Sequence, residues 1–441
     1  MLTTLRHRVF ARLFLAQVVA LLGTGLLTVA LALLAYDLAG DRAGTVLGTA
    51  LTLKMVAYVV LSPLFAALLA GLPRKAVLVG ADLIRAGVAL ALPFIESIWQ
   101  IYGLIFVLQA ASASFTPAFQ ATIPDILTDE KDYTNALSLS RLAYDLENLL
   151  SPTIAGLLLL MMSYSMLFVG TVAGFLISAA LILSVTLPER TVVQRPFRER
   201  LTRGVFIYLA TPRLRGLLAL NMAVAAVIAF VLVDTVVLVR GRFGGGEGEV
   251  AMAMAAFGAG SMVAALALPG LLDRVPDRAV MLSGGLGLAS VGLAYAAVLL
   301  AGGVSWPLLL AVWAVLGLCN AAVMTPSGRL LRRSAHEEDR PAIFTAQFAL
   351  SHACWLLAYP AAGWLGPLLG LEATLSLLAL VAGGSVLLAI RLWPARAAEE
   401  IAHDHPDLPP DHPHLRAHGG GAGHSHPIII DDEHLHWPSR G

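Results

Sequence analysis

Long apolar stretches recur along the first 395 residues, separated by short polar connections. Twelve of them centre near residues 26, 58, 86, 108, 150, 176, 226, 261, 290, 314, 355 and 382. About 20 residues of α-helix cross the hydrocarbon core of a bilayer. Because backbone polar groups in lipid must bond within their own segment, and the alternation of a barrel strand is absent, we expect twelve transmembrane helices. The first stretch is too long for a cleavable signal peptide.

The composition agrees with this pattern. Apolar residues make up 58% of the chain and charged residues 13%, whereas about a quarter of a soluble domain is charged. The sequence therefore predicts an integral, all-α membrane protein. Cys319 and Cys354 both lie inside apolar stretches, which argues against a disulfide framework.

Basic residues gather in alternate connections. They precede the first stretch, follow the second at Arg74 and Lys75, and are densest in the connection over residues 189–212. The positive-inside rule then places both termini in the cytoplasm. We expect the protein to lie in the plasma (inner) membrane.

The chain also repeats itself. Residues 72–78 after the second stretch resemble residues 275–281 after the eighth, and Thr116-Pro117 is echoed by Thr325-Pro326. This repeat indicates two pseudo-symmetric six-helix bundles that rock against each other. The expected divisions are an N-terminal bundle at 1–188, a basic connection at 189–212, a C-terminal bundle at 213–394 and a tail at 395–441.

The tail is rich in histidine, acidic residues, proline and glycine, and it has no apolar face to bury, so we expect it to be disordered without metal. Its imidazoles suit nickel, zinc, copper and cobalt alike. The predicted metal ligands are His403, His405, His412, His414, His418, His424, His426, His434 and His436. The alternative is a solvated polar tail with no ligand.

Ionisable residues inside a membrane are costly, so each is a candidate for function. The expected substrate and proton pathway comprises Asp145, Glu147, Asn148, His352 and Asp234. Asp145 and Glu147 point some 200° apart on a helix, so one face of that helix is expected to line a single cavity. Alternatively, the fifth span begins after both acids and Asp145 pairs with Arg141. His352 could equally be a hydrogen-bonded structural residue, and Asp234 could mark only the membrane interface.

One motif carries a family resemblance. Residues 273–278, Asp-Arg-Val-Pro-Asp-Arg, resemble a signature of the major facilitator superfamily, and residues 70–75 are a degraded copy without the acid. The resemblance implies a charged gating latch, for which the candidates are Asp273, Arg274, Arg278, Arg74 and Lys75. Residues 81–86 and the stretch from 114 to 137 resemble the enterobactin-exporter-like branch. With the histidine-rich tail, the chain is similar to the nickel-resistance exporters of that branch.

No nucleotide-binding loop of the G-x-x-x-x-G-K type occurs, so an ion gradient is the expected energy source. The resemblance implies a monomeric proton antiporter that exports nickel, and possibly cobalt, from the cytoplasm. The alternatives are an exporter of an organic solute, such as a siderophore or drug, with an accessory metal-binding tail, or a membrane-tethered metal sensor. No nucleophile and base arrangement supports an enzyme. We expect no cofactor other than Ni²⁺ or Co²⁺ that is transported or bound by the tail. The lipid bilayer is an expected partner, and nucleic acids and nucleotides are not.

Overall fold

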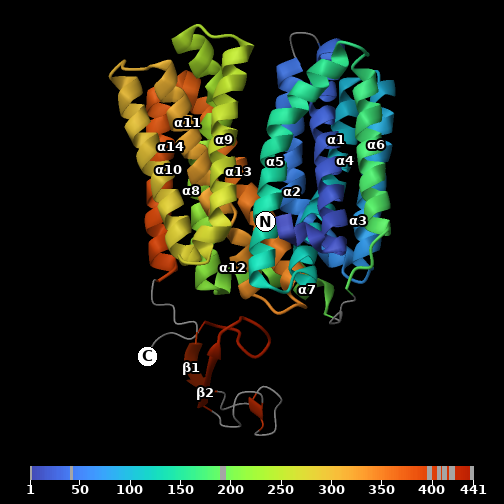
Figure 1. The fold of residues 1–441 in the computed structure, drawn as a ribbon, viewed down its shortest axis with the longest axis vertical. Coiled ribbons are helices and arrows are strands. Elements are labelled where there is room, and N and C mark those ends of the chain that lie inside the picture. Colours follow the sequence, from blue (N-terminus) through green and yellow to red (C-terminus); the bar gives the residue numbers. More distant parts are fainter. Residues whose placement is uncertain are drawn as a thin grey trace.

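The computed structural model describes residues 2–39, 43–188, 195–394, 400–404, 409, 415–416 and 423–437 of the 441-residue chain. It is almost entirely helical. Two bundles stand side by side, and a small C-terminal sheet lies beyond one end of them (Figure 1). We call the membrane side on which this sheet lies the tail side, and the opposite side the distal side.

The N-terminal bundle contains six long helices. A short 3-10 turn (Leu2–Arg6) precedes α1, and another (Leu92–Phe94) precedes α4. The long helices are α1 (Arg8–Ala39), α2 (Ala43–Leu69), α3 (Arg74–Ala91), α4 (Ile98–Ile126), α5 (Glu130–Leu159) and α6 (Ser165–Leu183).

The C-terminal bundle repeats this plan after a connecting helix, α7 (Phe197–Ala210). Its helices are α8 (Pro212–Phe243), α9 (Glu247–Leu272), α10 (Asp277–Leu300), α11 (Trp306–Met324), the short α12 (Ser327–Arg333), α13 (Arg340–Leu369) and α14 (Leu371–Leu392). The strands β1 (Glu400–Asp404) and β2 (Gly423–Pro427) follow.

Within the described ranges, twelve helices reach at least 18 residues, and their positions match the twelve predicted spans. Eleven candidate membrane spans are long and apolar enough to cross a bilayer. The remaining long helix, α5, has 30 residues and places Arg141, Asp145 and Glu147 near its middle. The predicted all-α fold of two helical bundles is therefore confirmed. The side of the membrane on which the termini lie stays a prediction.

Local sequence sets several helix ends. The Asp129 carboxylate accepts a hydrogen bond from the backbone N–H of Asp132 and caps α5, which satisfies one of the four donors left open at a helix start. The Gln100 side chain accepts from the backbone N–H of Ser97 at the start of α4. At the C-terminal end of α8, Gly244 adopts a φ of 62°. This left-handed conformation favours glycine and ends the helix.

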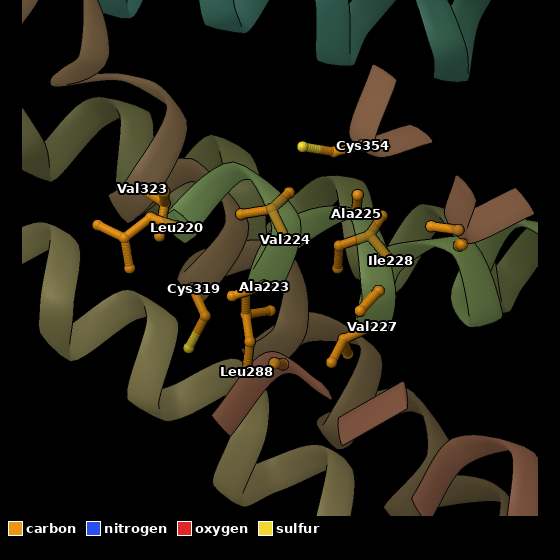
Figure 2. Close-up of a cluster of buried hydrophobic side chains, with 14 of the residues drawn as sticks. Leu220, Ala223, Val224, Ala225, Val227, Ile228, Leu288, Cys319, Val323 and Cys354 are labelled. Carbon is orange, nitrogen blue, oxygen red and sulfur yellow. The ribbon is translucent and has the colours of Figure 1, made fainter. Parts of the chain in front are cut away.

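Helix α8 forms the centre of the C-terminal bundle. It is apolar on nearly all sides, as a fully surrounded helix must be, and Leu220, Val224 and Val227 pack against Leu288 of α10 and Cys319 of α11 (Figure 2). Cys354 of α13 lies in the same cluster. Both cysteines are buried free thiols, so they behave here as small apolar residues.

Helices α9 and α11 approach so closely that only glycine fits at their crossing. A Cβ at Gly260 would stand 1.8 Å from the carbonyl oxygen of Ala314, and one at Gly317 would stand 1.9 Å from that of Phe257. Close backbone approach through small residues is a common means of packing helices in membranes. Since α9 also contacts α5 of the other bundle, this crossing fixes one wall of the junction between the bundles.

Gly260→Ala should therefore destabilise the protein, because the added methyl group forces two backbones apart. We expect a loss of about 1–3 kcal/mol, as for overpacked cores, seen as a lower melting temperature of the purified protein in detergent. Gly270→Ala is the matched control, since it lies on the same helix and a Cβ there meets open space. An unchanged melting temperature for Gly260→Ala would contradict the described packing.

Candidate functional site

Two pairs of helices form much of the junction between the bundles. Helix α5 packs against α9, and α2 packs against α13, which also touches α4 and α7. Proline residues interrupt several of these helices, among them Pro63 in α2, Pro269 in α9 and Pro360 in α13. A proline inside a helix removes a backbone hydrogen bond and bends the helix.

Asp145 lies on α5 at this junction and is buried, with 4% of its surface exposed. One carboxylate oxygen lies 3.1 Å from the Arg141 guanidinium, and the other accepts a 2.6 Å hydrogen bond from the hydroxyl of Ser261 on α9. Arg141 also donates to that hydroxyl at 3.0 Å. Asp145 thus lies within the long helix, pairs with Arg141 and bonds to the opposite bundle. The expected pairing of Asp145 with Arg141 is therefore present, whereas a role of Asp145 in the substrate and proton pathway stays a prediction.

Glu147 points to a different neighbourhood from Asp145. Its carboxylate lies close to Gly25 of α1, and Lys54 of α2 is near enough to attract its charge. The two acids therefore face different sides of α5, as the helical geometry predicts. Asn148 belongs to the same helix, but its side chain falls outside the described part of the structure.

His352 of α13 faces the N-terminal bundle. Its ring meets Tyr58 of α2 edge-on at a centroid distance of 4.8 Å, and the Lys54 ammonium lies 5.6 Å from the centre of the same tyrosine ring. The imidazole Nδ1 lies 2.7 Å from the backbone carbonyl of Phe348, which orients the ring and leaves Nε2 for other partners. Cys354 points instead into the apolar cluster of its own bundle, so the two residues do not share a site.

Asp234 lies elsewhere, inside the C-terminal bundle. It is 3% exposed, and one carboxylate oxygen lies 3.2 Å from the position a Cβ would take at Gly366 of α13. Its Oδ2 has no hydrogen-bond partner among the described residues. The structure therefore buries Asp234 between α8 and α13 in the distal half and does not bring it to the α5–α9 contact.

A network of ion pairs closes the tail side between the bundles. Asp277, at the start of α10, lies 3.1 Å from Arg329 and 3.0 Å from Arg333. Glu130 of α5 lies 2.9 Å from Arg329 and also pairs with Arg333. Tyr133 adds a 3.1 Å hydrogen bond from its hydroxyl to a backbone carbonyl of the opposite bundle.

The acid of this network is not the one that the motif indicates. Asp273 and Arg274 lie exposed where α9 ends, and Arg278 donates a 2.7 Å hydrogen bond to the Trp393 carbonyl. The described charged contact runs through Asp277, four residues later, because Asp277 begins the next helix and faces α12.

A second charged contact joins the bundles nearby. The Asp125 carboxylate at the end of α4 lies 2.6 Å from Arg74 of α3 and 2.6 Å from Arg340 of α13. Arg74 and Lys75 also line a cavity of about 600 Å³ on the tail side between α2, α4, α7 and α13. We refer to the ion pairs of Glu130, Asp277, Arg329 and Arg333 together with those of Asp125, Arg74 and Arg340 as the tail-side clamp.

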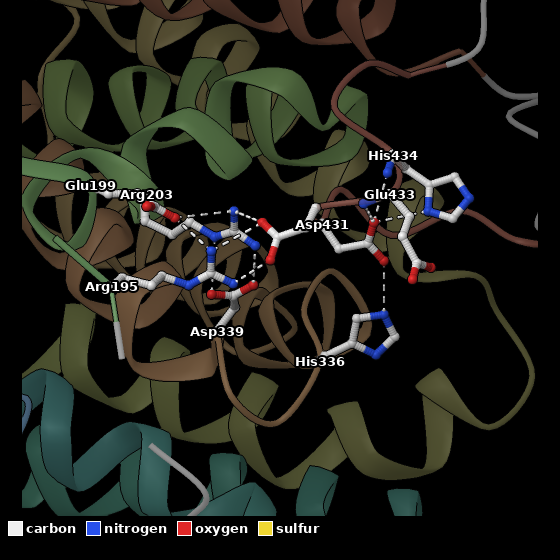
Figure 3. Close-up of polar contacts among 9 residues, drawn as sticks. Arg195, Glu199, Arg203, His336, Asp339, Asp431, Glu433 and His434 are labelled. Atoms are coloured by element: carbon white, nitrogen blue, oxygen red, sulfur yellow. Dashed lines mark hydrogen bonds and ion pairs between the residues drawn. The ribbon is translucent and has the colours of Figure 1, made fainter. Parts of the chain in front are cut away.

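The tail differs from the expected disordered segment in its described residues. Strands β1 and β2 pair antiparallel, with His403 in register with His424. Ile428 and Ile430 are buried, and Ile430 packs in the apolar cluster of the C-terminal bundle. Asp432 forms ion pairs of 2.6 Å with Arg195 and 2.6 Å with Arg203 of α7, so the tail is attached to the connection between the bundles (Figures 1 and 3).

The structure describes the side chains of four predicted metal ligands of the tail, which are His424, His426, His434 and His436. His424, His426 and His434 lie together, with ring centroids 5.1 Å apart between the first two and 5.1 Å between the last two. His434 also groups with Asp431 and Glu433, whose ligand atoms all lie within 4.8 Å of one another, whereas His436 is exposed. His405, His412, His414 and His418 lie outside the described residues, as does the side chain of His403.

Three residues that contact the predicted site residues were not predicted from the sequence. Tyr58 lies four residues after Lys54, on the same face of α2, and Ser261 follows a glycine that marks a close crossing. Those two signals were present but weak. His336 contacts Asp431 of the tail at 3.3 Å. No local sequence pattern predicts a contact between two residues that are nearly a hundred positions apart.

Comparison with known proteins agrees with this architecture. The family model of the Major Facilitator Superfamily matches residues 13–244 and 217–408. The chain is 26% identical over 142 residues to macrolide efflux protein A of Enterococcus faecalis, and 24% identical over 185 residues to that of Streptococcus pyogenes. These matches cover 31% and 41% of this chain and 44% and 45% of the relatives, so the chain spans less than half of their length.

Two solved structures share the fold. The human organic anion transporter MFSD10 superposes with a TM-score of 0.70 at 15% identity, covering 87% of this chain and 99% of that one. A bacterial homologue of the iron transporter ferroportin, in an outward-facing state, gives 0.67 at 17% identity, covering 87% and 98%. Because the matched family model spans most of the sequence, the chain belongs to the major facilitator superfamily.

Proposed function

We propose that this transporter exports divalent transition metal, nickel first and cobalt second, from the cytoplasm of a cell whose inner membrane it spans. The observation that carries the proposal is the group of imidazole and carboxylate ligands attached to the tail side of the body, at His434, Asp431 and Glu433. Nitrogen and carboxylate oxygen are suitable ligands for these ions. The efflux relatives favour export over uptake.

Proton antiport is the proposed source of energy. Asp145, Glu147 and His352 are ionisable and lie at or beside the junction of the bundles, where a change of protonation alters contacts between them. A proton bound by Asp145 would remove the charge that attracts Arg141 and would weaken the link to Ser261. Metal entering from the tail side would then meet carboxylate and imidazole groups from opposite bundles.

The described state is closed on the tail side, where the tail-side clamp joins the bundles. Opening toward the tail must break that clamp together with the contact of Tyr58 with His352 and that of Asp145 with Ser261. We propose that these contacts separate in one rocking motion, which gives alternating access around the middle of the membrane.

An organic solute is the second candidate substrate. Tyr58 and Phe348 lie at the junction with a centroid distance of 4.8 Å, and Trp355 and Tyr359 continue an aromatic row along α13. Aromatic surfaces suit flat organic molecules, and the matched relatives are macrolide efflux proteins. In this case the tail would act as an accessory metal buffer.

Nickel uptake into inverted membrane vesicles separates the two candidates. We expect uptake that depends on an imposed proton gradient and that cobalt reduces more strongly than zinc or an organic dye. Transport of the dye with no nickel accumulation would instead identify an organic exporter. Vesicles without the protein give the background.

Asp145→Asn should reduce gradient-driven nickel uptake by about ten-fold or more, as loss of a group acting at the central step would. The amide keeps the size of the side chain but cannot carry the charge that holds Arg141. Asp37→Asn is the control, because Asp37 is an exposed acid near the distal end of α1. Equal uptake by wild type and Asp145→Asn would remove Asp145 from the pathway.

Deleting residues 399–441 should weaken nickel resistance of cells without abolishing it, and less than Asp145→Asn does. The deletion removes the ligands that gather metal, but it leaves the junction intact. Deleting only residues 405–422 is the matched comparison, because the attached segment from 423 to 437 remains. Complete loss of vesicle transport on deletion of 399–441 would place the tail inside the pathway.

A further inference from the structure

Asp431, in the tail segment that follows β2, contacts both the tail and the body. Asp431 Oδ1 accepts hydrogen bonds from the backbone N–H of Glu433 at 2.9 Å and of His434 at 2.7 Å, and lies 2.9 Å from His434 Nδ1. Asp431 Oδ2 lies 3.3 Å from Nε2 of His336, in the loop between α12 and α13 (Figure 3). One carboxylate therefore contacts an imidazole from the tail and another from the body.

The separations suit a shared ion. With ligand bonds near 2.0–2.2 Å, neighbouring ligand atoms lie roughly 2.8–3.6 Å apart, with the lower values at the 90° angles that suit nickel and the upper values at tetrahedral angles. The His336 and Asp431 atoms already stand at that separation. Glu433 and His434 lie within 4.8 Å of each other and of Asp431, so small side-chain movements bring them into the same shell.

The surroundings keep this group in place. Asp432, the next residue, bonds to Arg195 and Arg203, and Arg203 in turn bonds to Asp339 at the start of α13 at 2.9 Å. His434 is nearly buried, with 6% of its surface exposed, whereas His336 is half-exposed. The group thus lies beside the junction of α7 and α13 and remains open to solvent on one side.

We infer that His336, Asp431, Glu433 and His434 form one divalent transition-metal site shared between the tail and the body. This inference rests on the proposed function for the kind of ion. Bound metal would join the tail to the loop that leads into α13. Metal binding on the tail side would therefore act on α13, a helix of the junction.

Chemical modification of histidine tests the inference directly. Full-length protein in detergent is treated with diethylpyrocarbonate with and without Ni²⁺, and the modification of His336, His434 and His7 is followed by peptide mass spectrometry. We expect Ni²⁺ to protect His336 and His434 together over the same concentration range. His7 is exposed near the N-terminus and should react equally with and without the ion.

Two variants separate ligation from attachment of the tail. His434→Ala and Glu433→Gln should each raise the Ni²⁺ concentration that half-protects His336 by about ten-fold or more, as expected for removal of a metal contact. Glu433→Gln leaves the backbone bonds to Asp431 and the ion pairs of Asp432 in place. Protection of His434 without protection of His336 would overturn the shared site, as would unchanged protection of His336 in both variants.

Nickel uptake into vesicles that contain the same protein is measured separately from the modification of His336. Nickel uptake into vesicles without Ni²⁺-dependent protection of His336 would overturn the shared site and leave the proposed function standing. Protection of His336 without nickel uptake would overturn the proposed function and leave the site in place.

Discussion

Ion pairs on the tail side determine how the two bundles meet. Glu130 and Asp125 come from the N-terminal bundle, and Arg329, Arg333 and Arg340 come from the C-terminal one. The Asp125 and Arg340 side chains are only 10% and 13% exposed, so separating them requires water to solvate both charges. Glu130 and Arg333 are already open to solvent, so their pair contributes less. Arg340 begins α13, so the helix that closes the tail side is also the helix that places His352 at the middle of the junction.

The twelve long helices could be predicted because apolar length is a local property of the sequence. Pairing of charges is not local. The motif at 273–278 indicated Asp273, yet Asp277 makes the contact because it begins α10 and meets α12 there. Which of two nearby acids faces an arginine depends on where one helix ends and the next begins, and a shift of four residues is too small for hydropathy to resolve.

The tail shows the same limit in another form. Its composition favours disorder, but β1 and β2 pair across an interval of eighteen residues, and that pairing depends on where the body holds the chain. Arg195 and Arg203 supply the attachment through Asp432. The run of isoleucines from 428 to 430 was a local signal, because Ile428 and Ile430 are buried, and Ile430 together with Trp437 joins the apolar cluster of the C-terminal bundle.

Asp145 and Glu147, near the middle of helix α5, contact different neighbours. Asp145 faces α9, so its contacts change when the bundles separate, whereas Glu147 faces α1 and α2 of its own bundle. Lys54 links these two settings, because it attracts Glu147 and lies over Tyr58, which meets His352 of α13. In the rocking motion that we propose, each bundle would move as a packed unit, so separation at Ser261 would accompany separation at His352. A cation or proton bound at either contact would then act on the same motion, and coupling would need no pathway beyond the rigid helices themselves.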